Sequence, residues 1–455
     1  MKLFIIVIGV IFSLISFDIK AEEITPIPDT ETSEKIIKLN PIQIINLAKE
    51  FIKNKEYDSA KTLLLKSPFN VKELEIERLY LLSEIATLEN RIDDAIEILR
   101  FILDYQPNIS SIRFKLAQLY MLQKSWYRAD YHLRLAATDE TLPPPVKQEI
   151  AKYIYVARQN KNWNIWFNIG AAPDDNINNA TGGEQCIMTM WGVLCNQLSD
   201  KEKAIGFNVS LGGSYEFLIN DKWRLRNEAM LYSNTYNKKE YDDLYLSYNF
   251  GPKYVWKNGE IFAGPSAYRR WLAHQPYSYA VGLKINTGYD FTRSLSGGLT
   301  LSYMPTRYDD YGEILDGDTR GINARLSYMF DASKYLIFRT GYEIENTKER
   351  IYSNTRNSYA IGFGIELPYG FTMYVEPSIL YTNYDKERWF VKNLKFEEIK
   401  EKDITRKYSL SLSNRKLSFW GFSPTITYTY TDKNSNVWQH EYEKSAIEMT
   451  LNQRF

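Results

Sequence analysis

The spacing of apolar residues changes once along the chain, near Trp163. Over residues 41–160, apolar side chains recur every three to four positions, which is the period of an amphipathic α-helix. After Trp163 they alternate with polar side chains, and this alternation predicts β-strands with one apolar and one polar face. The segment 423–431 is a clear example, with isoleucine and tyrosines on one face and threonines on the other. The pattern therefore predicts a helical domain at 41–160 and a β domain at 161–455.

The N-terminal segment has the composition of an export signal. A basic residue near the start precedes an apolar run from Leu3 to Phe17, and Ala21 is a small residue at which a signal peptidase would cleave. A run of roughly 15 residues is too short to cross a bilayer core comfortably, which argues against a membrane anchor. We therefore expect residues 1–21 to be a signal peptide and the polar segment 22–40 to be a flexible leader.

The helical segment contains three units of similar sequence, spaced by 34 or 35 residues. Small residues occupy two positions in each unit, where they allow two helices to approach closely, and leucines around them form the stripe that packs on the next unit. The small residues are Ala48, Ala60, Ser83, Ala95, Ala117 and Ala129. The pattern resembles the tetratricopeptide repeat and predicts a solenoid. Its groove would bind an extended segment of another protein, and a spacer without a ligand is the alternative.

We expect fourteen strands in the β domain, joined by links that alternate between short and long. The short links lie near residues 220, 258, 292, 331, 369 and 419. Most of the others are longer or more polar, among them 176–202, 274–277, 308–318 and 386–403. This asymmetry favours a 14-stranded antiparallel transmembrane β-barrel over a soluble all-β domain. An even number of strands places both ends of the barrel, and thus the helical domain, in the periplasm of a bacterium with an outer membrane.

Composition agrees with a barrel and excludes other classes. Lys plus Arg and Asp plus Glu both number 56, so a basic nucleic-acid-binding protein is not expected. Aromatic residues make up 15% of the chain, including 35 tyrosines, which suit strands that meet lipid headgroups or line a wet lumen. The three histidines are scattered, and we expect no metal and no cofactor. We find no P-loop, HExxH or nucleophile elbow, so we do not expect an enzyme.

Charged residues also occur on the polar face of the expected strands. Glu216, Arg339, Glu366 and Glu376 are examples. An unpaired charge in apolar surroundings is costly, so these residues imply a wet lumen or charges that pair with one another. Structural pairing is the simpler interpretation, and specific binding of a client protein is the alternative.

Two cysteines lie in the first long link of the β domain. Cys186 and Cys195 would form a disulfide in the oxidising compartment that export implies. The bond would pin the apolar stretch 188–194 into a small lobe. This lobe could fold into the lumen as a plug or contact a client.

A polar signature, DDNINNA, follows the first expected strand at residues 174–180. It does not fit an EF-hand calcium loop, because Asn179 and Gln185 stand where that loop needs glycine and glutamate. A polar strand end and direct contact with a substrate are the two remaining interpretations. The polar residues of this junction signature that we single out are Asp174, Asp175, Asn176 and Asn178. Tetratricopeptide-like helices, this signature and a fourteen-strand barrel together resemble the surface lipoprotein assembly modulators, over about residues 41–455.

The resemblance implies an outer-membrane translocator that helps client lipoproteins, or related secreted proteins, reach the cell surface. The helices would bind the client and the barrel would pass it on. The implied partners are the client, outer-membrane lipids, the barrel assembly machinery and periplasmic chaperones, with no nucleic acid. Phe455 ends the last strand and resembles the signal read by that machinery. A polysaccharide exporter and a porin with an accessory domain remain as alternatives.

Overall fold

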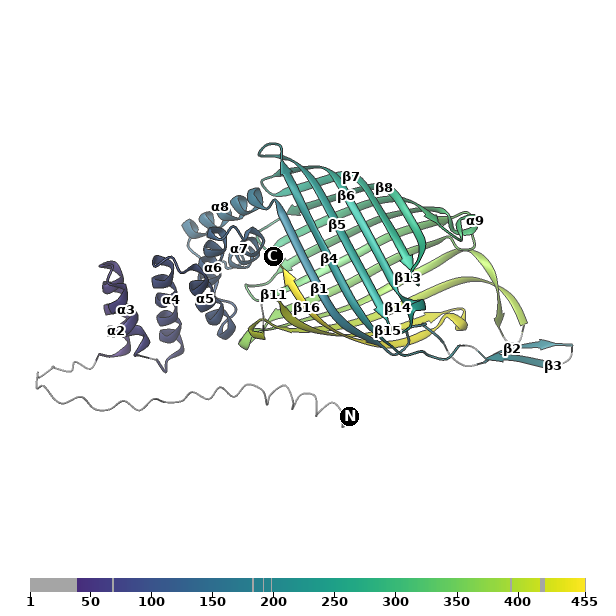
Figure 1. The fold of residues 1–455 in the computed structure, drawn as a ribbon, viewed down its shortest axis with the longest axis horizontal. Coiled ribbons are helices and arrows are strands. Elements are labelled where there is room, and N and C mark those ends of the chain that lie inside the picture. The colour runs from purple at the N-terminus through teal and green to yellow at the C-terminus, as the bar shows by residue number, and fades with distance from the viewer. Residues whose placement is uncertain are drawn as a thin grey trace, which may run out of the picture.

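A stack of helices leads into a closed barrel in the computed structural model (Figure 1). The structure describes residues 39–454 except for 68, 182–183, 191, 198, 393–394 and 418–421. The expected signal peptide (1–21), nearly all of the expected leader (22–40) and Phe455 lie outside the described residues.

The described helices before the barrel form three pairs followed by a single helix. They are α2 (Pro41–Lys53), α3 (Tyr57–Leu65), α4 (Lys72–Leu88), α5 (Ile92–Tyr105), α6 (Ser110–Leu122), α7 (Trp126–Ala137) and α8 (Pro144–Asn160). In each pair the turn uses a left-handed residue two positions past the first helix: Lys55, Asn90 and Lys124, with φ of 66°, 61° and 57°. The repeat that is visible in the sequence is therefore also present in the backbone, where each helix pair has the same left-handed turn.

The core of the helical region (residues 41–160) runs through the stack as three overlapping apolar clusters. The first joins α2, α3 and α4, the second α4 to α7, and the third α6 to α8. All six small residues of the repeat pattern have an exposed fraction of 0%. Their burial is what the close approach of paired helices requires. Among the described residues, no helix is long and apolar enough to cross a membrane.

Fourteen strands, each antiparallel to its neighbours, close into the barrel, and β1 completes the circle by pairing with β16. The strands are β1 (Trp163–Asp174), β4 (Ala204–Leu218), β5 (Trp223–Tyr236), β6 (Asp243–Trp256), β7 (Gly259–Leu272), β8 (Gln275–Asp290), β9 (Leu295–Tyr308), β10 (Gly317–Met329), β11 (Lys334–Thr347), β12 (Asn354–Glu366), β13 (Phe371–Lys392), β14 (Lys395–Asn414), β15 (Ser423–Ser435) and β16 (Tyr442–Arg454). The predicted fold, a helical region followed by a 14-stranded barrel, is confirmed.

The barrel has two different rims. The near rim, against which the helices pack, carries the links that we expected to be short (Figure 1). The far rim carries the loop with β2 (Glu184–Thr189) and β3 (Gly192–Gln197), the short helix α9 (Gly312–Leu315), and the 3₁₀ turns η1 (Lys239–Tyr241) and η4 (Trp438–His440).

Two far-rim links differ from the prediction. The segment 386–403 is mostly strand, because β13 and β14 run for 22 and 20 residues to Lys392 and from Lys395. Its charged residues fall on both faces, so the alternation that marks a strand in contact with lipid is missing from the sequence. The link after β7 is a two-residue turn, in which Ala273 and His274 have φ of 48° and 64°. These values suit a tight hairpin turn rather than a longer loop.

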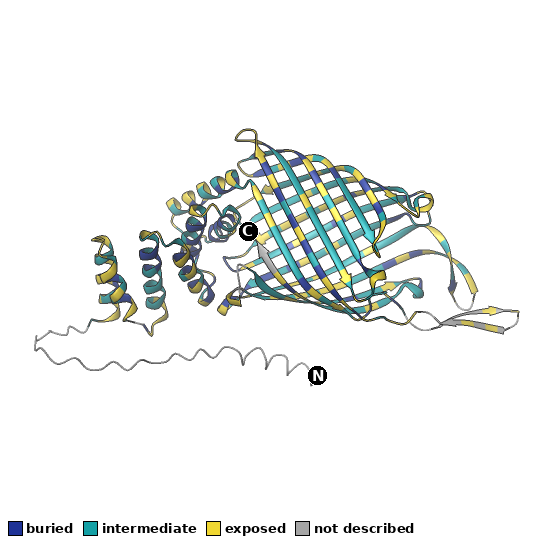
Figure 2. Cartoon of the chain, in the orientation of Figure 1, coloured by how far each residue is buried: buried dark blue, intermediate teal, exposed yellow. Residues whose placement is uncertain are grey.

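The two faces of the barrel wall alternate along each strand (Figure 2). On β4, Asn208 and Ser210 are buried, whereas Phe207 and Leu211 are 49% and 44% exposed. Polar and small side chains therefore point into the lumen, and apolar side chains point outward. This is the arrangement of a barrel whose outer face contacts lipid.

Candidate functional site

The helical region packs against the near rim through α5, α6, α7 and α8 (Figure 1). Side chains and carbonyl groups of these helices bond to groups at the ends of strands β5, β6, β8 and β12. We call this contact the joint. It is the place where a protein bound to the helices would meet the entrance of the barrel, and it is the first candidate functional site.

A fully buried arginine forms the first part of the joint. Arg113 of α6 has no exposed surface, and its guanidinium donates to Oε2 of Glu366, the last residue of β12, at 2.6 Å. Its Nε also donates to the carbonyl oxygen of Pro107 at 2.9 Å. Tyr131 of α7 donates to the other carboxylate oxygen of Glu366. Burial and the charge of Glu366 raise the pKa of Tyr131 well above its usual range, so its hydroxyl keeps the proton that it donates.

Two arginines converge on Asp290, the last residue of β8. Arg134 of α7 contacts Oδ1 at 2.8 Å, and Arg158 of α8 contacts Oδ2. Arg134 also pairs with Asp130, which in turn accepts a bond of 2.9 Å from Lys161. Burial alone would raise the pKa of Asp130, but the charges of Lys161 and Arg134 outweigh it and hold the pKa far below its usual range. Each carboxylate in this part of the joint is therefore paired with two cations.

The end of α8 is capped by the barrel. Glu216 of β4 is buried and pairs with Arg224 at 2.9 Å and with Lys253 at 2.8 Å. The same Arg224 donates to the carbonyl oxygens of Arg158 and Gln159, at 3.0 and 3.1 Å. The last carbonyls of a helix have no partner within the helix, and a cation there also opposes the negative end of the helix dipole. The barrel thus supplies hydrogen-bond donors for the last carbonyl groups of α8, the helix that leads into β1.

An aromatic contact extends the joint to α5. The Lys416 ammonium lies 5.4 Å from the ring centre of Phe101, 5.2 Å from that of Tyr105 and 5.8 Å from that of Tyr369. Phe101 and Tyr105 belong to α5, whereas Tyr369 lies in the link after β12. This cation–π cluster joins the two parts of the chain without burying a charge.

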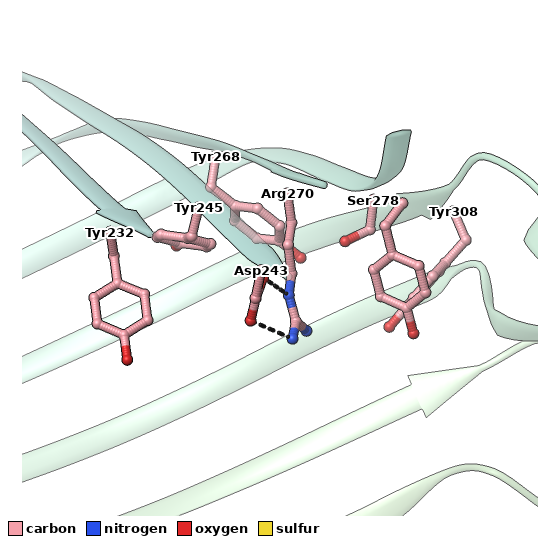
Figure 3. Close-up of a pocket in the computed structure, with 8 residues that line it drawn as sticks. Tyr232, Asp243, Tyr245, Tyr268, Arg270, Ser278 and Tyr308 are labelled. Carbon is pink, nitrogen blue, oxygen red and sulfur yellow. Dashed lines mark hydrogen bonds and ion pairs between the residues drawn. The ribbon is translucent and has the colours of Figure 1, made fainter. Parts of the chain in front are cut away.

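A second candidate site lies inside the barrel near the far rim. It is a cavity of about 290 Å³ between strands β5 and β9 (Figure 3). Its walls carry five tyrosines and one ion pair. In this pair Arg270 donates hydrogen bonds of 2.9 and 2.8 Å to the two carboxylate oxygens of Asp243. The lining residues are Tyr232, Asp243, Tyr245, Tyr268, Arg270, Tyr277, Ser278 and Tyr308. Tyrosine rings offer flat apolar faces with a polar tip, so such a cavity can contact many kinds of chain without strict selectivity.

A cluster of charges fixes the base of the long β13–β14 hairpin. Glu401 is 1% exposed and pairs with Arg388 and with Nδ1 of His440 at 2.5 Å. Asp403, beside it, accepts from Lys433 at 2.8 Å. Burial, together with the charges of Lys433 and Arg388, lowers the pKa of His440. The cluster ties the hairpin to the link before β16.

The junction signature, predicted as a strand end or a substrate contact, bonds to the last strand and the link before it. Asn176 has no exposed surface, and its Nδ2 donates to the carbonyl oxygens of Ala180 and Glu443, at 3.0 and 3.2 Å. Its Oδ1 accepts from the amide of Ala180 at 2.8 Å. Asp174 pairs with Lys444 at 3.2 Å.

The other two polar residues of the signature act in the same region. Asp175 accepts from the amide of Ser445 at 2.8 Å. Asn178 donates to the carbonyl of Asp200 at 2.8 Å and accepts from the amide of Glu202 at 3.0 Å, which closes the base of the first long loop. These contacts give all four residues a role in holding the chain together.

The barrel sequence identifies the family. A family model described as surface lipoprotein assembly modifier matches residues 163–455. The chain belongs to this family. Its members are named for assembly and not for a catalysed reaction.

Several curated relatives carry the same description. A surface lipoprotein assembly modifier of Pasteurella multocida is 23% identical over 398 residues, which are 82% of this chain and 75% of the relative. Surface lipoprotein assembly modifier 1 of Haemophilus influenzae is 23% identical over 80% of this chain and 74% of its own. That of Neisseria meningitidis is 21% identical over 83% and 75%.

Solved barrels are less similar. The outer membrane channel DcaP of Acinetobacter baumannii covers 64% of this chain and 97% of its own, with 8% identity and a TM-score of 0.37. A bacterial polysaccharide outer membrane secretin covers 64% and 98%, with 9% identity and a TM-score of 0.34. Scores this low carry no conclusion about function. A lipid-facing barrel in a chain of the surface lipoprotein assembly modifier family nevertheless places this protein in the outer membrane.

The predicted disulfide lies in a part of this family member that is only partly described. Cys195 is disulfide-bonded, and the register of β2 and β3 places its backbone opposite Cys186. The side chain of Cys186 lies outside the described residues, so its pairing with Cys195 stays a prediction. The lobe between them is a hairpin that projects beyond the far rim, and not a plug within the lumen (Figure 1).

Sequence reasoning singled out some residues of the joint and missed others. Glu216 and Glu366 were expected on the polar face, and both pair with arginines at the near rim. Arg339 pairs with Glu376 in the wall of the barrel, as expected for charges that compensate one another. Arg113 was missed, although an arginine on the buried face of a repeat helix is a signal in the sequence. Among the described residues, no group of three or more His, Cys, Asp or Glu is placed to hold a metal.

Proposed function

We propose that this protein delivers client lipoproteins, or related secreted proteins, across the outer membrane to the cell surface. The helical region is a periplasmic tetratricopeptide-like domain (residues 41–160) that binds the client, and the barrel (161–455) passes it outward. The names of the relatives support lipoproteins as the clients.

The joint is the observation that carries the proposal. Helices whose only role was to bind a periplasmic protein could be connected to the barrel by a flexible linker. Here, in contrast, the buried Arg113–Glu366 pair holds α6 against the near rim, and the buried Arg224 holds α8 there through its bonds to the carbonyl oxygens of Arg158 and Gln159. Breaking one partner of a buried pair leaves an uncompensated charge, which is strongly unfavourable. A client held by the helices is therefore held at the entrance of the barrel.

The orientation of the barrel supports the same pathway. β1 begins and β16 ends on the side of the helices, and the short links lie at that rim (Figure 1). Outer-membrane barrels place short turns in the periplasm and longer segments outside. The near rim would then face the periplasm, and the tyrosine-lined cavity would lie on the path toward the surface.

Surface labelling of a co-expressed lipoprotein tests the proposal. Full-length protein and a variant that lacks residues 22–160 are compared in a Gram-negative host without a homologue. A lipoprotein without a partner of this family serves as the control client. We expect labelling of the candidate client only with the full-length protein. Equal labelling with both proteins would contradict the role of the helical region.

A further inference from the structure

The cavity near the far rim is built from a row of residues that crosses one side of the lumen (Figure 3). Residues directly opposite each other on antiparallel strands point to the same face. The row consists of such register partners on five neighbouring strands: Tyr232 on β5, Tyr245 on β6, Arg270 on β7, Ser278 on β8 and Tyr308 on β9. Together with Tyr268 and Tyr277, which line the same cavity, we call them the tyrosine row.

A bulge in the β7–β8 pairing brings one of these tyrosines into the row. The register shifts after Arg270, so Tyr277 has no partner on β7. In a regular strand both neighbours of the inward-facing Ser278 would point outward, as Tyr279 does with an exposed fraction of 44%. A bulge changes the direction of the side chain at the extra residue. Tyr277 instead lines the cavity, where its ring stands edge-on to that of Tyr308 with centres 5.4 Å apart.

An ion pair holds part of the row in position. Arg270 donates its two hydrogen bonds to Asp243, the first residue of β6, and its guanidinium carbon lies 5.4 Å from the centre of the Tyr277 ring. A cation over an aromatic ring is attracted to the ring face. Tyr245 and Tyr268 form a second aromatic contact, stacked with centres 5.3 Å apart. Arg270 is therefore a positioning residue for the ring of Tyr277.

Three hydroxyl groups of the row have no hydrogen-bond partner among the described residues. They belong to Tyr245, Tyr277 and Tyr308, whereas Tyr232 accepts a bond from an asparagine and Tyr268 bonds to a threonine. A tyrosine hydroxyl both donates and accepts, so it can bond to the N–H or C=O group of any polypeptide backbone. The ring beside it contacts apolar side chains. The row thus offers contacts that do not depend on one particular sequence.

Another part of the lumen wall carries charges. Arg356 of β12 lies 2.5 Å from Glu343 and 3.0 Å from Glu345 of β11, and Arg339 pairs with Glu376 of β13. A chain in the lumen would meet aromatic rings over β5–β9 and charges over β11–β13. A polypeptide has both apolar and charged side chains for these two parts of the wall. A neutral polysaccharide has no charged groups for the second part, so the lumen favours a polypeptide.

We propose that the tyrosine row is the contact site for the client while it leaves the lumen as an extended, unfolded chain. The inference rests on the proposed function, because it names the state in which the client crosses. A cavity of about 290 Å³ is at the lower end of pockets that hold a small ligand, roughly 300–1,000 Å³. It accepts side chains of an extended segment and not a folded domain. Tyrosine rings make such contacts at a low cost in conformational entropy.

Photo-crosslinking in purified full-length protein tests the contact. The photoreactive amino acid p-benzoylphenylalanine replaces Tyr245 in one variant and the outward-facing Tyr279 in the matched control. The probe is the radiolabelled polypeptide of the candidate client, without acyl chains, unfolded in urea and diluted into the sample. We expect at least tenfold more crosslinked product at position 245 than at position 279. Equal crosslinking at the two positions would overturn the proposal, and so would equal crosslinking of folded and unfolded client at position 245.

Competition separates a polypeptide from a carbohydrate at the same site. Dextran, a neutral polysaccharide, is added to the crosslinking mixture in large excess over the unfolded client. The yield at position 245 should not change. A loss of the crosslinked product would assign the row to a carbohydrate and overturn the proposal.

Surface labelling of a co-expressed client gives a second measurement. The row variant is Tyr245→Ala/Tyr277→Ala/Tyr308→Ala, and the matched control removes three exposed tyrosines of the outer face, Tyr248→Ala/Tyr279→Ala/Tyr303→Ala. Labelling is normalised to the amount of folded barrel, which is read from its heat-modifiable mobility on gels. We expect at least a tenfold loss with the row variant and no loss with the control.

The two measurements distinguish the contact site from delivery itself. Full labelling with the row variant would overturn the role of the row and leave the delivery function intact. Crosslinking at position 245 in purified protein, without delivery by the wild-type protein in cells, would support the contact site and contradict the proposed function.

Discussion

Two contacts between distant parts of the chain hold this protein together, and they are built differently. The joint uses buried charges, among them Arg113 and Glu366, whose side chains are 0% and 4% exposed. The seam, by which we mean the contact between the first strand β1 and the last strand β16, uses ladder bonds, the polar contacts of the junction signature at the far rim and an aromatic contact between Phe167 and Phe422. Separating a buried ion pair leaves two desolvated charges without partners, and separating strands within the bilayer leaves backbone N–H and C=O groups without partners in lipid. The comparison indicates that the joint depends on buried charges, whereas the contact between the first and last strands depends mainly on backbone pairing.

The largest expected effect comes from breaking the joint at its buried pair. Glu366→Gln removes the charge that compensates Arg113, and we expect the joint to lose about 3 kcal/mol. Lys161 bonds to Asp130 in the intact joint, so trypsin cleavage at Lys161 reports opening. It should become roughly 100-fold faster. The control is Asp309→Asn, which breaks a half-exposed pair with Arg269 at the far rim and should leave cleavage unchanged.

Acid should weaken the joint through Asp130. Its pKa in the folded protein lies below the unfolded value of about 3.9, because Lys161 and Arg134 favour the charged form. The stabilisation is therefore complete above that pH and is lost as the pH falls below it. Thermal unfolding of the helices, followed by circular dichroism between neutral pH and pH 3, should show the loss. Asp130→Asn should be less stable at neutral pH and respond less to acid. An unchanged acid response in the variant would exclude Asp130 as the source.

A smaller effect is expected at the junction signature, whose side chains join the end of β1 to β16. Asn176→Ala removes the donor to the Glu443 carbonyl and should cost about 1–2 kcal/mol. The folded barrel should lose its heat-modifiable mobility on gels at a lower temperature than wild type. Asn178→Ala is the matched control, because it loosens only the base of the first loop. If the two variants behave alike, the signature does not act on the seam.

The smallest effect should come from the aromatic part of the joint. Lys416→Met keeps the length of the side chain but removes the cation that faces Phe101, Tyr105 and Tyr369. An exposed cation–π contact contributes about 0.5–1 kcal/mol, so cleavage at Lys161 should rise only a few-fold. An effect as large as that of Glu366→Gln would show that exposed contacts, and not buried charges, fix the joint.

The sequence predicted what depends on local periods. Helices and strands followed from the change of period at Trp163, and the repeat was visible because Ala60, Ala95 and Ala129 recur at regular spacing. The segment 386–403 was missed as strand because a hairpin beyond the lipid needs no apolar face. The alternation of apolar and polar residues therefore depends on whether a strand contacts lipid, and not only on whether the segment is a strand.

The contacts of the joint and the seam could not be predicted from the sequence, because the residues in contact are far apart along the chain. Arg113 and Glu366 are separated by 253 positions, and Asp175 and Ser445 by 270. Nothing local tells an acidic residue at the end of a strand which arginine it will meet. The signature was recognisable as a polar motif, but its role needed the closure of the barrel.

One comparison tests most directly whether the joint serves delivery. Surface labelling of a lipoprotein client is measured with Glu366→Gln/Asp290→Asn, which breaks the joint at two strands, and with the far-rim control Asp309→Asn. Faster cleavage at Lys161 verifies that the joint has opened in the double variant. We predict loss of client labelling with the opened joint and full labelling with the control. Full labelling with the opened joint would show that the helices need not be fixed at the barrel entrance, and would contradict the account.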